Sequence, residues 1–274
     1  MGERLTRELQ TPGPLDAGDH VAWVSHRPGE FEWLAAAQLS HGTRVGDKLF
    51  LLAPPRPARA PVLVADTVTV LDPVRAFLQG GAFQTETVLT MLREQDGIAR
   101  EEGFRGIRVV ADMDWLLDMP ADFADVLDFE QRLDGMVADL KALVVCVYRQ
   151  ESFVDSELAQ LMSVHPHIRQ SPPGPDAFRI WSAGGGRWRV SGDVDITCAA
   201  AFSARLASAA AGSARFVLDL RSVTFIDVAG LRAIVRCSLD CRVEIAVEGL
   251  SAATRKCWNL VGFSASAPNV EVVA

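Results

Sequence analysis

The sequence contains no apolar run that approaches the roughly 20 residues needed to cross a bilayer as a helix. The segment from Met1 to Asp19 is polar with scattered charges, so it also lacks the apolar core of a signal peptide. Both absences predict a cytoplasmic protein without a membrane partner. Basic residues are scarce too, because 27 Lys and Arg stand against 35 Asp and Glu and give a net charge of −8. A phosphate backbone favours dense basic surfaces, so nucleic acid is not an expected partner.

Motifs of common catalytic and metal-binding sites are also absent. The sequence has no GxxxxGKS or GxxxxGKT phosphate loop, no HExxH zinc motif and no GxSxG nucleophile motif. The cysteines form no CxxC pair, which predicts reduced and mostly buried thiols instead of disulfides or a zinc site: Cys146, Cys198, Cys237, Cys241 and Cys257. We therefore expect no cofactor, no metal and no ATP hydrolysis.

A chain of 274 residues, 49% of them hydrophobic, is long enough for two globular domains. After an N-terminal tail, residues 1–17, the first domain covers residues 18–170. It alternates β-rich runs with helix-periodic stretches, which predicts an α/β fold with a mainly parallel sheet and flanking helices. The expected strands are His20–Ser25, Lys48–Ala53, Val62–Ala65, Gly106–Ala111 and Leu143–Tyr148. The expected helices are Glu30–His41, Thr85–Glu102, Phe123–Lys141 and Ser152–Val164.

Residues 171–177 contain several prolines, which prevent helix propagation and central strand pairing and so predict a linker. A smaller α/β domain, residues 178–274, follows and opens with a β-hairpin whose turn is Gly184-Gly185-Gly186, since glycine accepts positive φ. The expected strands are Phe178–Ser182, Trp188–Ser191, Arg215–Leu220, Arg242–Val247 and Val270–Val273. The expected helices are Thr197–Ala210, Val228–Leu239 and Ala252–Val261.

The segment VLDLRSVTFIDVAGLRAIV, Val217–Val235, joins a buried strand, a turn and an abrupt helix start. Asp227 stands just before the apolar periodicity of the helix, where a carboxylate accepts the unpaired N–H groups of the first turn. Gly230 allows another backbone to approach this turn closely. We therefore predict a capped helix whose N-terminal end is a distinctive feature of the second domain.

From Phe178 onward the chain resembles the STAS family, which includes bacterial anti-sigma-factor antagonists. The resemblance rests on the Gly192-Asp193-Val194-Asp195 turn, the Leu218-Asp219-Leu220 strand and the Phe225-Ile226-Asp227 segment followed by Gly230-Leu231. It implies a sheet flanked by helices and a partner with a histidine-kinase-like fold, such as an anti-sigma factor. The residues expected to contact this partner are Asp193, Thr224, Asp227, Val228, Ala229, Gly230 and Arg232.

Antagonists of this kind commonly carry a phosphorylated Ser or Thr two residues after the aspartate. Ala229 occupies that position here and Val228 precedes it, although Ser222 and Thr224 lie nearby. Phosphorylation adds negative charge at a helix start, which expels a partner. The departure leads to the hypothesis that the second domain binds constitutively and is controlled by the first.

Residues 18–169 resemble the MEDS family of sensory domains. The resemblance is carried by Gly18-Asp19-His20-Val21, Gly46-Asp47-Lys48-Leu49, the segment Gly103–Trp115, Phe129-Glu130 with Arg132-Leu133, Cys146-Val147-Tyr148 and His165-Pro166. It implies a RecA-like parallel sheet that senses small organic ligands. Relatives often carry a cysteine two residues after the histidine, whereas this chain has Ala22, which argues against His/Cys metal or redox chemistry.

Ligands of parallel sheets gather at the carboxyl ends of the strands. On this basis the expected ligand-binding residues are His20, Trp23, Asp112, Asp114, Trp115, Glu130 and Tyr148.

All of these residues except Tyr148 also have a structural interpretation. His20 fits a histidine bonded to backbone, Asp112 and Asp114 fit loop caps, and the tryptophans fit core packing. Glu130 fits a solvated helix face, and its functional interpretation is an inward pairing with His20 or Arg108. His165-Pro166 is expected to end a helix instead of binding a ligand.

These observations favour a regulator whose first domain perceives a small ligand and whose second domain engages an anti-sigma factor or a related signalling protein. Two alternatives stay open. One is an enzyme that uses His20, Asp112, Asp114 and Glu130 for acid/base chemistry, and the other is a non-catalytic scaffold in which both domains bind only proteins.

Overall fold

The computed structural model describes residues 15–53, 67–77, 83–118, 122–169 and 178–273, together with the backbone of Arg7–Glu8. The chain divides into two compact units, residues 5–173 and residues 174–274. The predicted strand Val62–Ala65, the predicted linker and most of the predicted tail lie outside the described residues. No helix in the described part of the chain combines the length and apolar character needed to span a bilayer.

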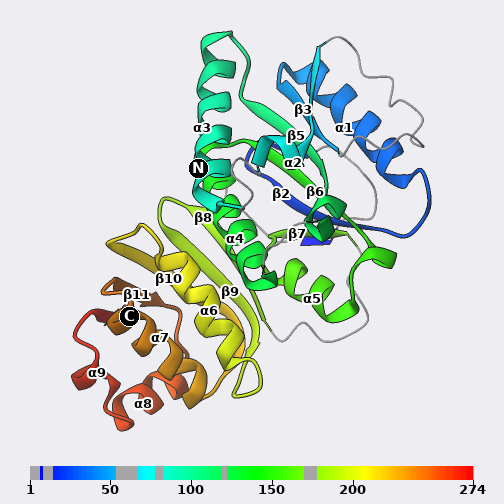
Figure 1. Cartoon of the computed structure of the whole chain (residues 1–274). Coiled ribbons are helices and arrows are strands. Elements are labelled where there is room, and N and C mark those ends of the chain that lie inside the picture. Colours follow the sequence, from blue (N-terminus) through cyan, green and yellow to red (C-terminus); the bar gives the residue numbers. More distant parts are fainter. Residues whose placement is uncertain are drawn as a thin grey trace. The chain divides into compact units, whose positions relative to one another are not determined.

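The first unit contains a sheet in which all described strand pairs are parallel (Figure 1). Its strand order is β1-β7-β2-β6-β5-β3-β4. The strands are β1 (Arg7–Glu8), β2 (His20–Ser25), β3 (Lys48–Leu52), β4 (Val68–Leu71), β5 (Ile107–Asp112), β6 (Leu143–Arg149) and β7 (His167–Arg169). The helices are α1 (Glu30–Val45), α2 (Pro73–Phe77), α3 (Thr85–Glu101), α4 (Phe123–Leu140) and α5 (Asp155–Ser163), with 3-10 turns at Met113–Asp118 and Gln150–Ser152. The expected α/β class is confirmed.

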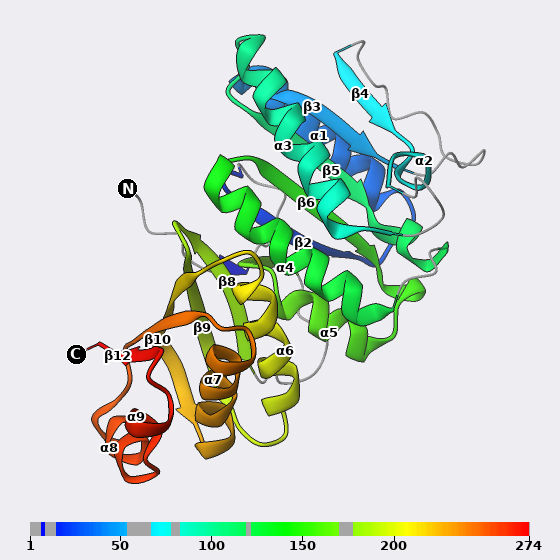
Figure 2. The same ribbon diagram turned by 60° about the vertical axis from the view of Figure 1, so that its left-hand side comes forward.

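Helices cover both faces of this sheet, as Figure 2 shows. Side chains alternate along a strand, so Val21 and Trp23 of β2 pack with α1, whereas Ala22 and Val24 pack in the core formed with α3, α4 and α5. β2 is buried along its whole length, as expected of a central parallel strand. The side chain of the first residue of β2, His20, shares the face of Ala22 and therefore points towards α4 and α5.

Three strands of the first unit were not predicted. β1 has only two residues, Arg7–Glu8, and lies in the segment that was expected to be a tail. β7 is only three residues long, His167-Ile168-Arg169. Only its central residue is apolar, so the sequence shows no β-rich run there. β4 lies at Val68–Leu71, and its side chains are half-buried or exposed because it is an edge strand of the sheet. Short or edge strands bury little apolar surface, so periodicity alone does not reveal them.

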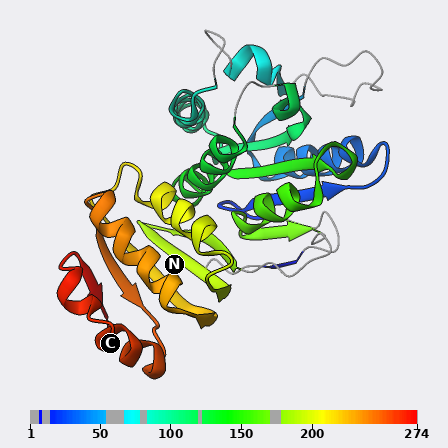
Figure 3. The same cartoon turned by 60° about the horizontal axis from the view of Figure 1, so that its bottom comes forward.

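The second unit is a mixed sheet in the order β12-β11-β10-β9-β8 (Figure 3). β8 (Phe178–Gly184) and β9 (Arg187–Val194) form the predicted antiparallel hairpin, and the three turn glycines all have positive φ. The remaining pairs are parallel and involve β10 (Arg215–Ile226), β11 (Glu244–Glu248) and β12 (Val270–Val272). The helices are α6 (Ala199–Ala210), α7 (Val228–Asp240), α8 (Ala252–Leu260) and α9 (Phe263–Ser266), and α6 and α7 pack against each other.

β10 is longer than predicted. The predicted strand ends at Leu220, but β10 continues to Ile226 beside β9, with register shifts between Asp219 and Ser222 and between Val223 and Phe225. The polar residues after Leu220 were interpreted as a turn, whereas β-bulges absorb the irregular spacing. The strand therefore runs directly up to Asp227 and delivers the chain to the start of α7.

Candidate functional site

A group of buried polar side chains lies between the sheet and helices α4 and α5 of the first unit. His20 comes from β2, Cys146 from β6, Glu130 from α4, and His165 from the segment that follows α5. These four residues, here called the His-Glu-Cys cluster, are fully buried, and their potential ligand atoms all lie within 4.8 Å of one another.

The distances inside the cluster are short. His20 Nε2 lies 3.4 Å from Glu130 Oε2, and His165 Nε2 lies 3.4 Å from the same oxygen. Cys146 Sγ lies 3.5 Å from His20 Nε2 and 3.6 Å from Glu130 Oε2. Of the two interpretations of Glu130, the inward pairing with His20 is therefore the one observed. Arg108 pairs with Asp47 instead.

The electrostatics of the cluster follow from burial and from these contacts. Burial opposes protonation of His20, but the carboxylates of Asp134 and Glu130 outweigh it and raise the pKa of His20. Burial alone would raise the pKa of Glu130, yet His165 and His20 lower it. Burial, followed by the charge of His20, lowers the pKa of His165. Burial and then the charge of Glu130 raise the pKa values of Cys146 and Tyr148 well above the ordinary ones.

The cluster contains two residues that the sequence analysis did not include in the ligand site. His165 was expected only to end a helix, but its ring stacks near that of His20, with centroids 4.1 Å apart. Cys146 is the register partner of Ala22, so the neighbouring strand supplies a thiol beside Ala22. A sequence cannot reveal this pairing, because the register of β2 and β6 joins residues more than a hundred positions apart.

The other predicted ligand-binding residues divide between the two faces of the sheet. Tyr148 joins the cluster, since its hydroxyl donates to Glu130 Oε1 at 2.8 Å. Trp23 lies on the opposite face, where its indole donates to Glu30 and the guanidinium of Arg169 lies 4.0 Å from its ring centroid.

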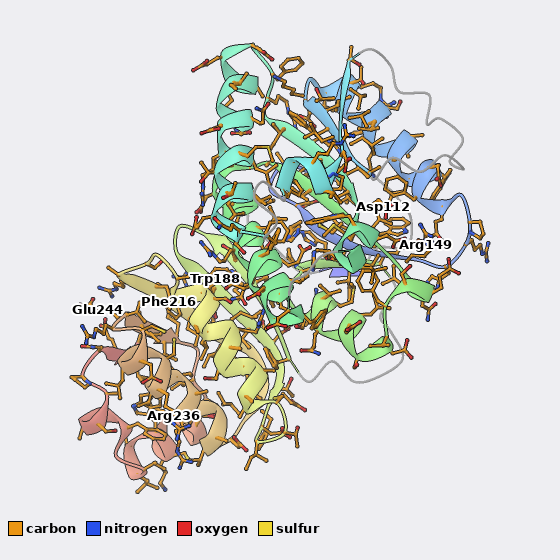
Figure 4. All side chains as sticks on the ribbon, in the orientation of Figure 1. Asp112, Arg149, Trp188, Phe216, Arg236 and Glu244 are labelled. Carbon is orange, nitrogen blue, oxygen red and sulfur yellow. The ribbon has the colours of Figure 1, made fainter. Side chains whose placement is uncertain are left out.

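Asp114 and Trp115 follow β5 as predicted, whereas Asp112 is the last residue of the strand instead of following it. Figure 4 shows Asp112 and Arg149 at this end of the sheet. Asp112 Oδ1 accepts the backbone N–H of Asp114 at 3.1 Å, which is the capping role that the sequence analysis weighed. Trp115 packs in the core against Phe77 and Phe83. It also lines, with Cys146, a cavity of about 20 Å³, which has room for about one water molecule.

A larger cavity of about 640 Å³ lies at the carboxyl ends of β2 and β6. This is where a parallel sheet usually binds ligands. Its lining is different from the predicted one and consists of Ser25, His26, Arg27, Pro28, Gly29, Phe31, Glu32, Arg149, Gln150 and Glu151. Asp114 is connected to it indirectly, through an ion pair with Arg149 at 2.9 Å.

The start of α7 in the second unit is built around Asp227. One carboxylate oxygen, Oδ1, accepts the N–H of Gly230 at 2.9 Å and caps the helix, as predicted. The other, Oδ2, accepts the N–H of Ile196 at 2.9 Å and so fixes the loop between β9 and α6. A Cβ on Gly230 would lie 2.8 Å from Val194 Cγ1 and from Ile226 Cγ1 and 3.2 Å from the backbone oxygen of Val194, so a larger residue would require these neighbours to shift.

The residues predicted to contact a partner surround this helix start, here called the α7 tip (Asp227, Val228, Ala229 and Gly230). Val228 and Ala229 are half-buried, whereas Asp193, Thr224 and Arg232 are exposed. Two apolar side chains that the prediction did not include are exposed as well, Ile196 at 75% and Phe225 at 54%.

Comparisons with known proteins match each unit to a family. A family model described as the MEthanogen/methylotroph, DcmR sensory (MEDS) domain matches residues 19–166, more than half of the chain. A model described as "Mlab, STAS domain" matches residues 182–271. Among solved structures, an anti-sigma factor antagonist from Mycobacterium paratuberculosis is 23% identical, covers 36% of this chain and 90% of its own, and has a TM-score of 0.31. No curated protein matches the chain.

Both matched families consist of regulatory domains, so the chain is a signalling regulator. It belongs to the MEDS family, and it joins its MEDS domain to a C-terminal STAS domain.

Proposed function

We propose that the STAS domain binds an anti-sigma factor or a related kinase-like signalling protein through the α7 tip, and that the MEDS domain senses a small organic ligand. Neither domain is proposed to catalyse a reaction. The observation that carries the proposal is the double hydrogen bonding of Asp227, which holds the start of α7 and the Ile196 loop together. Gly230 is buried and the other three tip residues are half-buried, but exposed side chains surround them. A rigid helix start of this kind suits protein recognition because little conformational entropy is lost on binding.

The side chains around the α7 tip support a protein partner. Phe225 and Ile196 offer exposed apolar surface, and Arg232 adds an exposed guanidinium on α7. Aromatic residues and arginine are enriched at protein interfaces, and a few of them usually carry most of the binding free energy.

Replacing Phe225 with serine should weaken partner binding by about tenfold or more, because an interface anchor contributes about 2 kcal/mol or more. The measurement is calorimetric titration of the intact chain with the histidine-kinase-like anti-sigma factors of its organism. Leu260→Ser is the matched control, because it also replaces an exposed apolar side chain with serine, at a 78% exposed residue of α8. It should leave the affinity unchanged. Equal affinities of both variants and the wild type would contradict the proposed surface.

Partner release by phosphorylation at the usual position is not proposed here, since Val228 and Ala229 carry no hydroxyl. After incubation with the partner kinase and ATP, mass spectrometry should find no stoichiometric phosphate between Asp227 and Gly230 or nearby. Ser222 and Thr224 are the exposed hydroxyl groups to examine. Stoichiometric phosphate on either of them would contradict constitutive binding and indicate that phosphorylation controls the partner instead.

The ligand of the MEDS domain is proposed to occupy the 640 Å³ cavity at the ends of β2 and β6. Arg27 and Arg149 line it together with Glu32 and Glu151, and Gly29 places the positive end of the α1 dipole there, so the cavity suits a polar organic ligand. Control of the STAS domain follows by linkage: if ligand and partner prefer the same domain arrangement, each raises the affinity of the other. The titration repeated with a small-molecule extract of the native cells tests this coupling.

A further inference from the structure

We propose that the His-Glu-Cys cluster binds one Zn²⁺ ion in a closed tetrahedral site inside the MEDS domain, with His20 Nε2, His165 Nε2, Cys146 Sγ and Glu130 Oε2 as ligands. The proposal does not depend on partner binding by the STAS domain. It rests on the geometry of four side chains, on the groups that orient them, and on their charges.

Four of the six separations among these atoms match those of a zinc tetrahedron, and all four ligand atoms lie within 4.8 Å of one another. Bonds of about 2.3 Å to sulfur and about 2.0 to 2.1 Å to nitrogen and oxygen, at tetrahedral angles, separate neighbouring ligand atoms by about 3.3 to 3.6 Å. The two nitrogen–oxygen distances are 3.4 Å each. The nitrogen–sulfur distance between His20 and Cys146 is 3.5 Å, and the oxygen–sulfur distance between Glu130 and Cys146 is 3.6 Å.

The hydrogen bonding of His165 requires its ligand nitrogen to face the centre of the cluster. Nδ1 lies 2.7 Å from the carbonyl oxygen of Leu161, which only accepts, so Nδ1 carries a hydrogen and donates it. In the neutral ring Nε2 then presents a lone pair towards Glu130 Oε2. A cation bound between Nε2 and Glu130 Oε2, which lie 3.4 Å apart, would accept this lone pair together with one from the carboxylate.

The other ligands are oriented in the same way by groups outside the cluster. The carboxylate of Asp134 lies 3.5 Å from His20 Nδ1, which leaves Nε2 for the centre. The hydroxyl of Tyr148 donates to Glu130 Oε1 and leaves Oε2 for the centre. A carboxylate or carbonyl behind each ligating histidine is the usual outer shell of a protein metal site.

Charge and burial favour a divalent cation. A thiolate, a carboxylate and two neutral imidazoles together carry two negative charges, which a dication neutralises in a site that is closed to solvent. Mixed sulfur and imidazole ligands in a tetrahedron favour Zn²⁺ over Mg²⁺ or Ca²⁺, which prefer oxygen ligands and higher coordination numbers. Four protein ligands leave no open position, so the site is structural and not catalytic.

Such an ion would hold the layers of the domain together. It would connect β2, β6, α4 and the segment after α5, which come from residues 20 to 165 of the chain. Closing such long segments restricts the unfolded state, so zinc binding and folding of the MEDS domain should be strongly coupled.

The test uses the intact chain, stripped with a chelator and reloaded with Zn²⁺ or Co²⁺. Elemental analysis should find one zinc ion per chain, and the Co²⁺ form should show the visible bands of a tetrahedral ion and a thiolate charge-transfer band. At free Zn²⁺ about 100-fold above its dissociation constant, the folding equilibrium constant of the domain should rise about 100-fold. Failure of the reloaded chain to bind stoichiometric metal, or iron or manganese in place of zinc, would overturn the assignment.

Variants separate this site from adventitious binding. Cys146→Ser should abolish the charge-transfer band, while Cys241→Ser, at an exposed cysteine of the STAS domain, should leave it unchanged. If Cys146→Ser does not fold, Tyr148→Phe retains all four ligands and removes only the orienting hydrogen bond, so it should lower the zinc affinity about 10- to 100-fold. A Co²⁺ spectrum and a zinc affinity that none of these changes alters would place the metal elsewhere.

Discussion

Replacing Arg108 with methionine should lower the free energy of unfolding of the MEDS domain by about 3 to 5 kcal/mol, because it leaves a buried carboxylate without its main partner. The guanidinium of Arg108 is fully buried, and its Nε donates to Asp47 Oδ2 at 2.9 Å. Its Nη1 donates to Gln38 Oε1 of α1 at 2.8 Å. Burial lowers the pKa of Arg108, and the charge of Asp47 opposes this effect.

The same carboxylate provides the control. Arg105 contacts Asp47 Oδ1 at 3.2 Å, but its side chain is 50% exposed. Because an exposed ion pair contributes about 1 kcal/mol or less, Arg105→Met should have a small effect. Hydrogen exchange at the amides of β3 and β5 measures the free energy of unfolding of both variants. Equal losses of unfolding free energy in the Arg108→Met and Arg105→Met variants would show that burial does not make the Arg108 contact more stabilising than the exposed one.

Restoring neutrality should recover most of the loss. In the double variant Arg108→Met with Asp47→Leu, neither charge remains in the buried position, and well-packed apolar groups of similar size often replace a buried ion pair without loss. A double variant that is no more stable than Arg108→Met would indicate that packing against α1, and not the unpaired charge, causes the effect.

Local features of the fold were predictable from the sequence. The strand His20–Ser25 was predicted with its observed bounds, because β-branched and apolar residues are confined to a short run between polar segments. The cap at Asp227 was predictable for a similar reason, since a helix start depends on residues within one turn of it. The MEDS and STAS resemblances were confirmed because their motifs occur in order along the chain.

Features that depend on distant segments were not predictable. The register that places Cys146 opposite Ala22 is set by the packing of the whole sheet, and a single sequence does not contain it. The turn of His165 towards His20 depends on where α5 ends against that sheet. The extension of β10 to Ile226 required bulges that adjust its pairing with β9. In each case the deciding contact joins segments that are separated along the chain.

Replacing Asp227 with alanine should lower the free energy of unfolding of the STAS domain by about 2 to 4 kcal/mol, because it removes two hydrogen bonds to a charged group. One of them caps α7 through Gly230, and the other holds the loop at Ile196. Asp227→Asn keeps one oxygen acceptor, and asparagine is a good N-cap, so its effect should be about 1 kcal/mol. The amides of α6 and α7, followed by hydrogen exchange, report the change.

The opposite end of the same helix gives the matched control. Asp240 is the last residue of α7 and is exposed, so its negative charge lies at the negative end of the helix dipole. Asp240→Ala should therefore leave the stability unchanged or raise it slightly. If the amides of α6 and α7 exchange at the same rate in the Asp227→Ala and Asp240→Ala variants, the carboxylate of Asp227 does not fix the α7 tip. If exchange is faster only in the Asp227→Ala variant, this variant should also bind the partner more weakly. Its recognition surface would no longer be held in one arrangement before binding.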